Sequence, residues 1–142
     1  MYKFTVLPID IEIGAATIWQ EARGESRVDQ FAVATVICNR TATRYTSDGT
    51  IAGTCLAPNQ FSGWRDKTLI AESLLAIRAN ETWAVVMTRT YHEDWIPGVV
   101  LPAWIGQAMN YFSPGAMEGQ PSPYWAHTAD YLGALPGFRF YR

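Results

Sequence analysis

Apolar residues recur at helical spacing close to the N-terminus of the chain. They are three or four positions apart and share one face of a helix: Ile11, Ala15, Ile18 and Ala22. We expect Asp10 to be the N-cap of this helix and Gly24 to end it. Glu21 then lies at the edge of the apolar stripe, where a carboxyl group can be half-buried and still face a cleft.

A second pattern predicts a central helix from Arg27 to about Arg40. Ser26 and Asp29 have the spacing of a capping box at its start. The stretch FAVATVIC that follows is apolar almost all round, which is typical of a helix buried on every side. Asn39 and Arg40 are polar, and we expect them to return the chain to the surface.

The remainder of the chain alternates between turn-rich stretches and shorter elements. Residues 41–66 carry several turn signals and are expected to form a loop region. Apolar spacing predicts a third helix that begins near Asp66, and a helical or strand-like piece over 83–88. Residues 94–125 are rich in Pro, Gly and aromatics, so we expect a long loop that serves binding. The end of the chain, 138–141, is expected to be an edge strand.

Composition narrows the classes of function. The chain has 142 residues, of which 49% are hydrophobic and 17% charged, and this fits one compact domain over residues 1–142. The net charge of −2 argues against nucleic acid as a partner, because proteins that bind the phosphate backbone are normally basic. The six Trp, seven Tyr and six Phe exceed what a core of this size needs. We therefore expect some aromatic rings to line a surface groove.

The cysteines and the N-terminus bear on the compartment. We expect Cys38, which lies in an apolar run, to be a buried free thiol, although a disulfide with Cys55 is also open. Residues 1–10 lack the basic and apolar regions of a signal peptide, and no apolar run reaches membrane-spanning length. The sequence therefore predicts a protein that is made in the cytoplasm and is not inserted into a membrane. A monomer is the default expectation, because nothing in the sequence indicates the oligomeric state.

The stretch WQEARGE, residues 19–25, holds the candidate chemistry. Cleavage of a glycan needs a carboxylic acid that keeps its proton near neutral pH. An exposed Glu has a pKa of about 4.3, so burial has to raise it. Glu21 lies beside Trp19 at a helix end, near the negative pole of the helix dipole, and both features favour the protonated form. The alternative is a helix end with an ordinary ion pair.

The stretch IWQEARGESRVDQFAVATVICNR resembles the opening signature of the SleB-type cell-wall hydrolases, a family of spore-cortex-lytic and phage or bacterial enzymes that cleave peptidoglycan. The resemblance continues in IAGTCLAPNQFSGW, GQAMNYFSPG, PYWA and the closing GFRFYR. It covers nearly the whole chain in the family's order, and the first motif is the most specific of the set.

The resemblance implies an α+β, predominantly helical fold with a lysozyme-related core, and peptidoglycan as the substrate, with no cofactor and no metal. It also implies that Glu21 is the catalytic acid of a lytic transglycosylase. In this chemistry one Glu acts first as acid and then as base, while the 6-hydroxyl of N-acetylmuramic acid closes a 1,6-anhydro ring. An internal nucleophile of this kind explains why no second carboxylate stands out in the sequence.

Five further residues are candidates for lining the substrate cleft: Gln60, Phe61, Asn110, Tyr111 and Trp125. Phe61 and Tyr111 could equally be core aromatics, Gln60 a loop brace and Trp125 a structural plug. Asn110 stands where many members of the resembled family have His before a Tyr-Phe pair. Asn keeps hydrogen bonding but does not titrate near neutral pH, so we expect it to position a sugar.

Other functions stay open on the sequence. A muramidase-type hydrolase would cut the same strand, and a cysteine peptidase or amidase would use Cys38 or Cys55 with His127. Cys38 lies late in its helix, at the end that disfavours a thiolate. A zinc amidase would need three ligands, whereas the chain has only His92 and His127 as histidines. The non-enzymatic alternative is a glycan-binding or phage structural module. Without a visible export signal, we expect release to the wall through a membrane pore, as in phage lysis.

Overall fold

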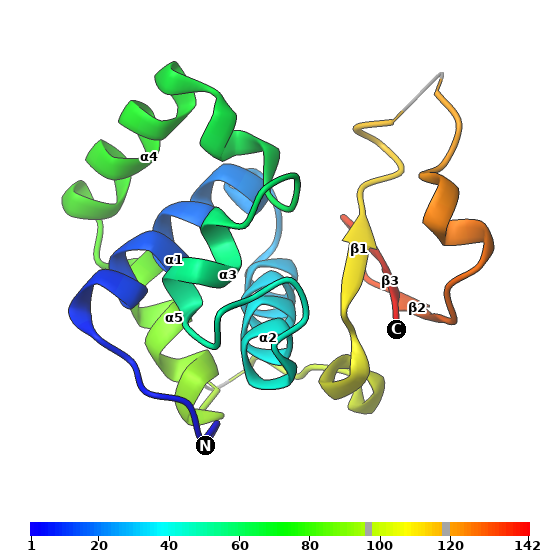
Figure 1. Ribbon diagram of the computed structural model, residues 1–142, viewed down its shortest axis with the longest axis horizontal. Coiled ribbons are helices and arrows are strands. Elements are labelled where there is room, and N and C mark those ends of the chain that lie inside the picture. Colours follow the sequence, from blue (N-terminus) through cyan, green and yellow to red (C-terminus); the bar gives the residue numbers. More distant parts are fainter. Residues whose placement is uncertain (96–97, 118–119) are drawn as a thin grey trace.

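The computed structural model describes residues 1–95, 98–117 and 120–142. Within them, five α-helices lie beside a small antiparallel sheet, and α2 is on the side that faces the sheet (Figure 1). The helices are α1 (Pro8–Ala22), α2 (Arg27–Thr43), α3 (Ile51–Leu56), α4 (Lys67–Ala79) and α5 (Thr82–His92). None of these helices is long and apolar enough to cross a membrane.

The sheet is built from three short strands in the order β1-β3-β2, and both pairs are antiparallel. The strands are β1 (Asn110–Phe112), β2 (Tyr131–Ala134) and β3 (Arg139–Tyr141). Because β3 is paired on both sides, the prediction that residues 138–141 form an edge strand is wrong. Tyr111 of β1 lies opposite Phe140 of β3, which is fully buried. This register fixes Tyr111 close to the core.

The first helix begins three residues earlier than the sequence predicts, with Leu7 as its N-cap, so the prediction of Asp10 as N-cap is wrong. Pro8 is its first residue, a position where the missing N–H of proline is not needed. Asp10 is buried in the first turn, and its carboxylate accepts hydrogen bonds from the backbone N–H of Leu7 at 2.8 Å and of Ala52 at 2.9 Å. It thereby ties the start of α1 to the start of α3.

The central helix is confirmed, and it runs three residues beyond Arg40 to Thr43. Ser26 is its N-cap and accepts a hydrogen bond from the backbone N–H of Asp29 at 3.3 Å. The threonines inside this buried helix are satisfied within it, because Thr35 and Thr41 each donate to the carbonyl four residues earlier at 2.8 Å. A helix can therefore be buried all round without orphaned hydroxyl groups.

Asn39 and Arg40 do not return the chain to the surface, since each is only 6% exposed. The amide of Asn39 donates to the carbonyls of Ile105 and Ala108 at 3.0 and 2.9 Å. The Nε of Arg40 donates to the carbonyl of Met109 at 2.7 Å. The expectation of exposure is wrong because these donors satisfy buried backbone carbonyls more than 60 residues away along the chain.

Two stretches expected to be loops contain short elements, and one ambiguous stretch is resolved. Residues 41–66 include α3 and the 3-10 helix η1 (Ser62–Arg65). The described part of 94–125 includes η2 (Ala103–Gln107), β1 and the first residues of η3 (Tyr124–His127). The stretch 83–88 is helical, inside α5, and the helix expected near Asp66 is α4, with Asp66 as its N-cap. The described residues thus form a predominantly helical α+β fold.

The attachment of the sheet to α2 can be tested by replacing Asn39 with alanine. The carbonyls of Ile105 and Ala108 would lose their buried donor, so we expect Asn39→Ala to lower the free energy of unfolding by about 2–5 kcal/mol. The matched control is Asn80→Ala, since Asn80 is exposed and its side chain accepts one hydrogen bond, from the backbone N–H of Thr82 at the start of α5. Thermal and urea unfolding measure both. Equal losses in the two variants would contradict the attachment.

Candidate active site

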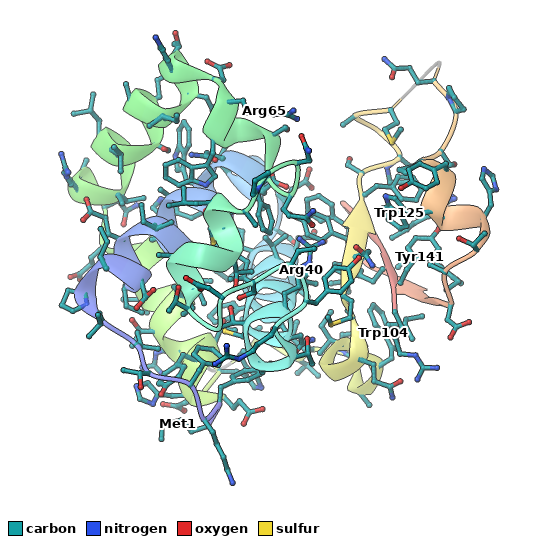
Figure 2. The ribbon with its side chains drawn as sticks, in the orientation of Figure 1. Met1, Arg40, Arg65, Trp104, Trp125 and Tyr141 are labelled. Atoms are coloured by element: carbon teal, nitrogen blue, oxygen red, sulfur yellow. The ribbon has the colours of Figure 1, made fainter. Side chains whose placement is uncertain are left out.

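A cavity of about 470 Å³ lies where the end of α2, the segment before η1, β1 and η3 meet. In Figure 2, Arg40 lies between the helices and β1, whereas Trp125 lies on the side of the sheet. Polar and aromatic side chains make up its wall: Arg40, Tyr45, Asn59, Gln60, Asn110, Tyr111, Tyr124 and Trp125. Four of these eight were singled out from the sequence, which are Gln60, Asn110, Tyr111 and Trp125.

Glu21 lies behind this wall, in the last turn of α1, and is half-buried. The hydroxyl of Tyr111 donates to Oε1 of Glu21 at 2.6 Å. Glu21 is not itself part of the cavity wall, so it adjoins the cavity through Tyr111. Oε2 accepts no hydrogen bond from the described residues, and it is not among their buried unpaired atoms. The second carboxyl oxygen is therefore open to solvent or to a ligand.

The protonation state of Glu21 is set by opposing effects. Burial raises its pKa above the ordinary value and is the largest cause, while the hydrogen bond from Tyr111 and the charge of Arg40 lower it. Burial prevails, so the carboxyl group holds its proton more strongly than an exposed Glu. Burial and the neighbouring Glu21 also raise the pKa of Tyr111 well above its usual range. Tyr111 therefore remains a hydrogen-bond donor.

Arg40 is the principal residue of the cavity that sequence reasoning missed. Its guanidinium donates to the carbonyl of Met109 at 2.7 Å, to Oδ1 of Asn110 at 3.2 Å, and over 3.5 Å to Oε1 of Gln60. These bonds bring Asn110 and Gln60 together in one wall, although they are 50 positions apart in the sequence. The signal that could have found it is an arginine placed at the end of an otherwise apolar, buried helix.

Phe61 and Trp125 are placed differently from each other. Phe61 is 4% exposed and belongs to the hydrophobic core, with the guanidinium of Arg40 lying 5.1 Å from its ring centroid. It supports the cavity from beneath and does not line it. Trp125 does line the cavity and packs edge-on against Tyr141 and Phe112, with centroid distances of 5.3 and 6.1 Å. Figure 2 shows Trp125 and Tyr141 next to each other.

Tyr45, Asn59 and Tyr124 also line the cavity and were not singled out from the sequence. Tyr45 is 43% exposed and Tyr124 is 86% exposed. Exposed tyrosines at the rim of a polar cavity offer flat apolar faces and a hydroxyl group, a combination that suits sugar rings. Tyr124 is next to the predicted cleft residue Trp125 in the sequence, and this adjacency was the signal that could have identified it.

The thiol alternatives find little support in the environment of the two cysteines. Cys38 and Cys55 are both free and buried, so the expected buried free thiol at Cys38 is confirmed. Burial raises the pKa of Cys55 to about 12 and that of Cys38 well above its ordinary range. Such thiols are poor nucleophiles near neutral pH. Within the described residues, His127 is exposed and no group of three or more His, Cys, Asp and Glu side chains is placed to hold a metal ion.

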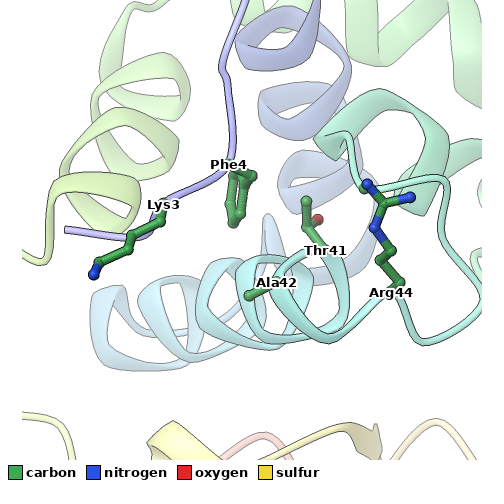
Figure 3. Close-up of a pocket in the computed structure, with 6 residues that line it drawn as sticks. Lys3, Phe4, Thr41, Ala42 and Arg44 are labelled. Carbon is green, nitrogen blue, oxygen red and sulfur yellow. The ribbon is translucent and has the colours of Figure 1, made fainter.

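A second cavity, of about 260 Å³, lies between the N-terminal segment and the end of α2 (Figure 3). Lys3 and Arg44 supply its charged groups, and Phe4, Thr41, Ala42 and Gly49 complete its wall. None of these six residues carries a carboxyl group. This cavity therefore lacks a carboxyl group like that of Glu21, which adjoins the larger one.

Comparison with known proteins places the fold among enzymes of the bacterial cell wall. The sequence model of a family described as Cell Wall Hydrolase matches residues 24–141, a range that begins three residues after Glu21. The structure is similar to the catalytic domain of the germination-specific lytic transglycosylase SleB from Bacillus anthracis, with a TM-score of 0.67 and 26% identity over 96% of each chain. It is also similar to the catalytic domain of SleB from Bacillus cereus, with a TM-score of 0.68 and 25% identity over 97% of this chain and 93% of that one. A comparison of the sequence with curated proteins gives no significant match.

The bond between Tyr111 and Glu21 can be tested by Tyr111→Phe. The hydroxyl stabilises the ionised carboxylate, so its removal should raise the pKa of Glu21 further. NMR titration of the Glu21 carboxyl carbon measures this directly. Tyr124→Phe is the matched control, since Tyr124 lines the same cavity but is 86% exposed. A lowered or unchanged pKa of Glu21 in Tyr111→Phe would show that the hydrogen bond does not form in solution.

Proposed function

Since the chain belongs to the cell wall hydrolase family, we propose that it cleaves the glycan strand of peptidoglycan as a lytic transglycosylase. The bond cut is the one between N-acetylmuramic acid and N-acetylglucosamine, and Glu21 is the single acid and base. The observation that carries the proposal is the half-buried Glu21, held through one oxygen by Tyr111 beside a cavity lined with polar and aromatic groups.

The first step is proton transfer from Glu21 to the glycosidic oxygen. Burial raises the pKa of Glu21, so the group is still protonated when the substrate arrives. Tyr111 donates to Oε1, which leaves Oε2 as the oxygen that carries the proton. As the bond between C1 of N-acetylmuramic acid and the glycosidic oxygen breaks, its electron pair stays with that oxygen. The leaving sugar departs with a free 4-hydroxyl group.

The second step returns the proton. Glu21 is now ionised, and the hydrogen bond from Tyr111 stabilises the carboxylate, since it favours the charged form. The carboxylate accepts the proton of the 6-hydroxyl of N-acetylmuramic acid while that oxygen bonds to C1. The product is a 1,6-anhydro sugar, no water is consumed, and Glu21 is protonated again.

The cavity wall suits a carbohydrate. Amide groups of Asn59, Gln60 and Asn110 can donate to and accept from sugar hydroxyls, while the rings of Tyr45 and Tyr124 give apolar faces at the rim. At about 470 Å³ the cavity is in the range of small-molecule sites. These features support a saccharide as the substrate class.

Simple hydrolysis of the same bond is the second candidate. A hydrolase of either stereochemistry normally uses two carboxyl groups that flank the bond. None of the eight described residues of the cavity wall carries one. The arrangement therefore favours the internal 6-hydroxyl, which replaces an activated water and needs only one carboxyl group.

The assignment of Glu21 is tested by Glu21→Gln. We expect this variant to lose its activity on purified cell walls, measured as turbidity loss, by at least about a hundredfold. Burial raises the folded-state pKa of Glu21, so its ionisation costs stability as the pH rises through that value. Glu21→Gln should therefore gain stability over the unmodified protein at pH 8 and lose that advantage near pH 4.

The control is Glu25→Gln, because Glu25 is the carboxyl group on the other side of Gly24 and the first one inside the matched family range. We expect Glu25→Gln to keep its activity. If Glu21→Gln still lowers the turbidity of cell walls fully, or if only Glu25→Gln fails to lower it, the catalytic acid is a residue other than Glu21. If the unmodified protein binds cell walls but cleaves nothing, it is the non-enzymatic glycan-binding module that the sequence left open.

The reaction type is tested by mass spectrometry of the soluble products from purified peptidoglycan. A transglycosylase releases fragments that end in a 1,6-anhydro sugar and are one water lighter than fragments with a reducing end. We expect the fragments that are one water lighter. Borohydride should not reduce them, because a 1,6-anhydro sugar has no reducing end. Products that end in a reducing sugar would identify a hydrolase, and free peptides would identify an amidase.

A further inference from the structure

Arg40 is a buried cation that has no carboxylate partner within the described part of the chain. The side chain is 6% exposed, yet none of the ion pairs formed by the described residues includes it. Its hydrogen-bond partners are the carbonyl of Met109 and the amide oxygens of Asn110 and Gln60, all of them neutral. Buried charges in proteins are normally paired. An unpaired one in the wall of a cavity points to an anion that arrives with the ligand.

The hydrogen bonds orient the guanidinium of Arg40 but do not engage all of its N–H groups. A guanidinium has five N–H groups, and three of them are engaged by Met109, Asn110 and Gln60. The rings of Phe61 and Tyr45 lie 5.1 and 5.7 Å from its central carbon. Two N–H groups, one on each terminal nitrogen, are therefore left for a ligand, and the two terminal nitrogens together match the two oxygens of a carboxylate.

We propose that Arg40 binds a carboxylate of the substrate and thereby selects which of the two alternating glycosidic bonds reaches Glu21. This inference rests on the proposed function. Of the two sugars in peptidoglycan, only N-acetylmuramic acid carries a lactyl group. The carboxylates of the polymer are on that group or on the peptide that extends from it. A cation fixed next to Tyr111 and Glu21 therefore distinguishes the two sugars.

The same contact favours the acid step. The positive charge of Arg40 lowers the pKa of Glu21, and a bound carboxylate neutralises that charge. The pKa of Glu21 should therefore rise when the substrate binds, so the proton is retained until the glycosidic oxygen takes it. The basic limb of the pH profile should lie at higher pH for kcat than for kcat/KM.

General electrostatics would produce the opposite preference. The net charge of the chain is −2, so a substrate stripped of its negative charges would be repelled less. A preference for the charged substrate therefore has to come from a local site. This makes neutralisation of the substrate a direct test that needs no variant of the protein.

The experiment compares soluble glycan strands with their carboxyl groups free and the same strands after carbodiimide coupling to ammonia. The experiment has two arms. One uses strands that keep their peptides. The other uses strands from which an amidase has removed the peptides, which leaves the lactyl carboxylate free. We expect amidation to raise KM at least about tenfold in one arm or both, as the loss of a charge-assisted hydrogen bond requires. The arm that responds identifies the source of the carboxylate.

Variants of Arg40 test whether this residue causes the discrimination between charged and amidated strands. Arg40→Gln should cleave charged and amidated strands with the same, raised KM, and Arg40→Lys should recover only part of the discrimination because it lacks the planar fork. Arg44→Gln is the matched control, because it removes one positive charge from the same end of α2 but lines the other cavity. It should discriminate as the unmodified protein does.

Equal KM values of the unmodified protein for charged and amidated strands in both arms would overturn the proposal, and cleavage itself would leave the proposed function standing. Discrimination that persists unchanged in a folded Arg40→Gln variant would overturn it as well. If no strand of any kind is cleaved, the proposed function fails first and the role of Arg40 fails with it.

Discussion

Hydrogen bonds from the end of α2 to the backbone of residues 105–109 attach the sheet to the helices beside the candidate active site. Asn39 and Arg40 donate to three carbonyls there, and buried carbonyls need such donors. The sheet has three strands of three or four residues each, and so small a sheet gains stability by packing against a helix. Its position is therefore set by α2, and that position brings Tyr111 to Glu21.

This attachment creates a conflict at the carboxyl group. A helix that donates through Arg40 also places a positive charge near Glu21, which favours the ionised form that an acid catalyst must avoid. Burial opposes it and is the larger effect on the pKa. Together with the hydrogen bond from Tyr111, burial suits both halves of the proposed reaction, because the acid has to keep its proton at first and tolerate a negative charge afterwards.

Local patterns could predict the helices, and contacts between distant residues could not be predicted. Apolar spacing correctly indicated α1, α2 and α4, whose signals lie within one helix, and the predicted cap at Ser26 is confirmed while that at Asp10 is wrong. The burial of Asn39 and Arg40 and the central place of β3 depend on partners far away in the sequence, so no local pattern shows them. Glu21 was singled out as the candidate acid through its motif and a family resemblance. The exposure of Tyr124 and the burial of Phe61 required the packing of segments around the cavity.

Asn110 shows why a non-titrating residue suits this wall. Its Oδ1 accepts from Arg40 at 3.2 Å, and an amide oxygen accepts a hydrogen bond at every pH at which the protein is folded. A histidine would lose its acceptor when protonated and would add a second positive charge beside Arg40. The guanidinium would then be less well oriented, and the pKa of Glu21 would fall. With Asn in this place, the orientation of Arg40 is independent of pH, and in the proposed reaction the only proton transfers are those of Glu21.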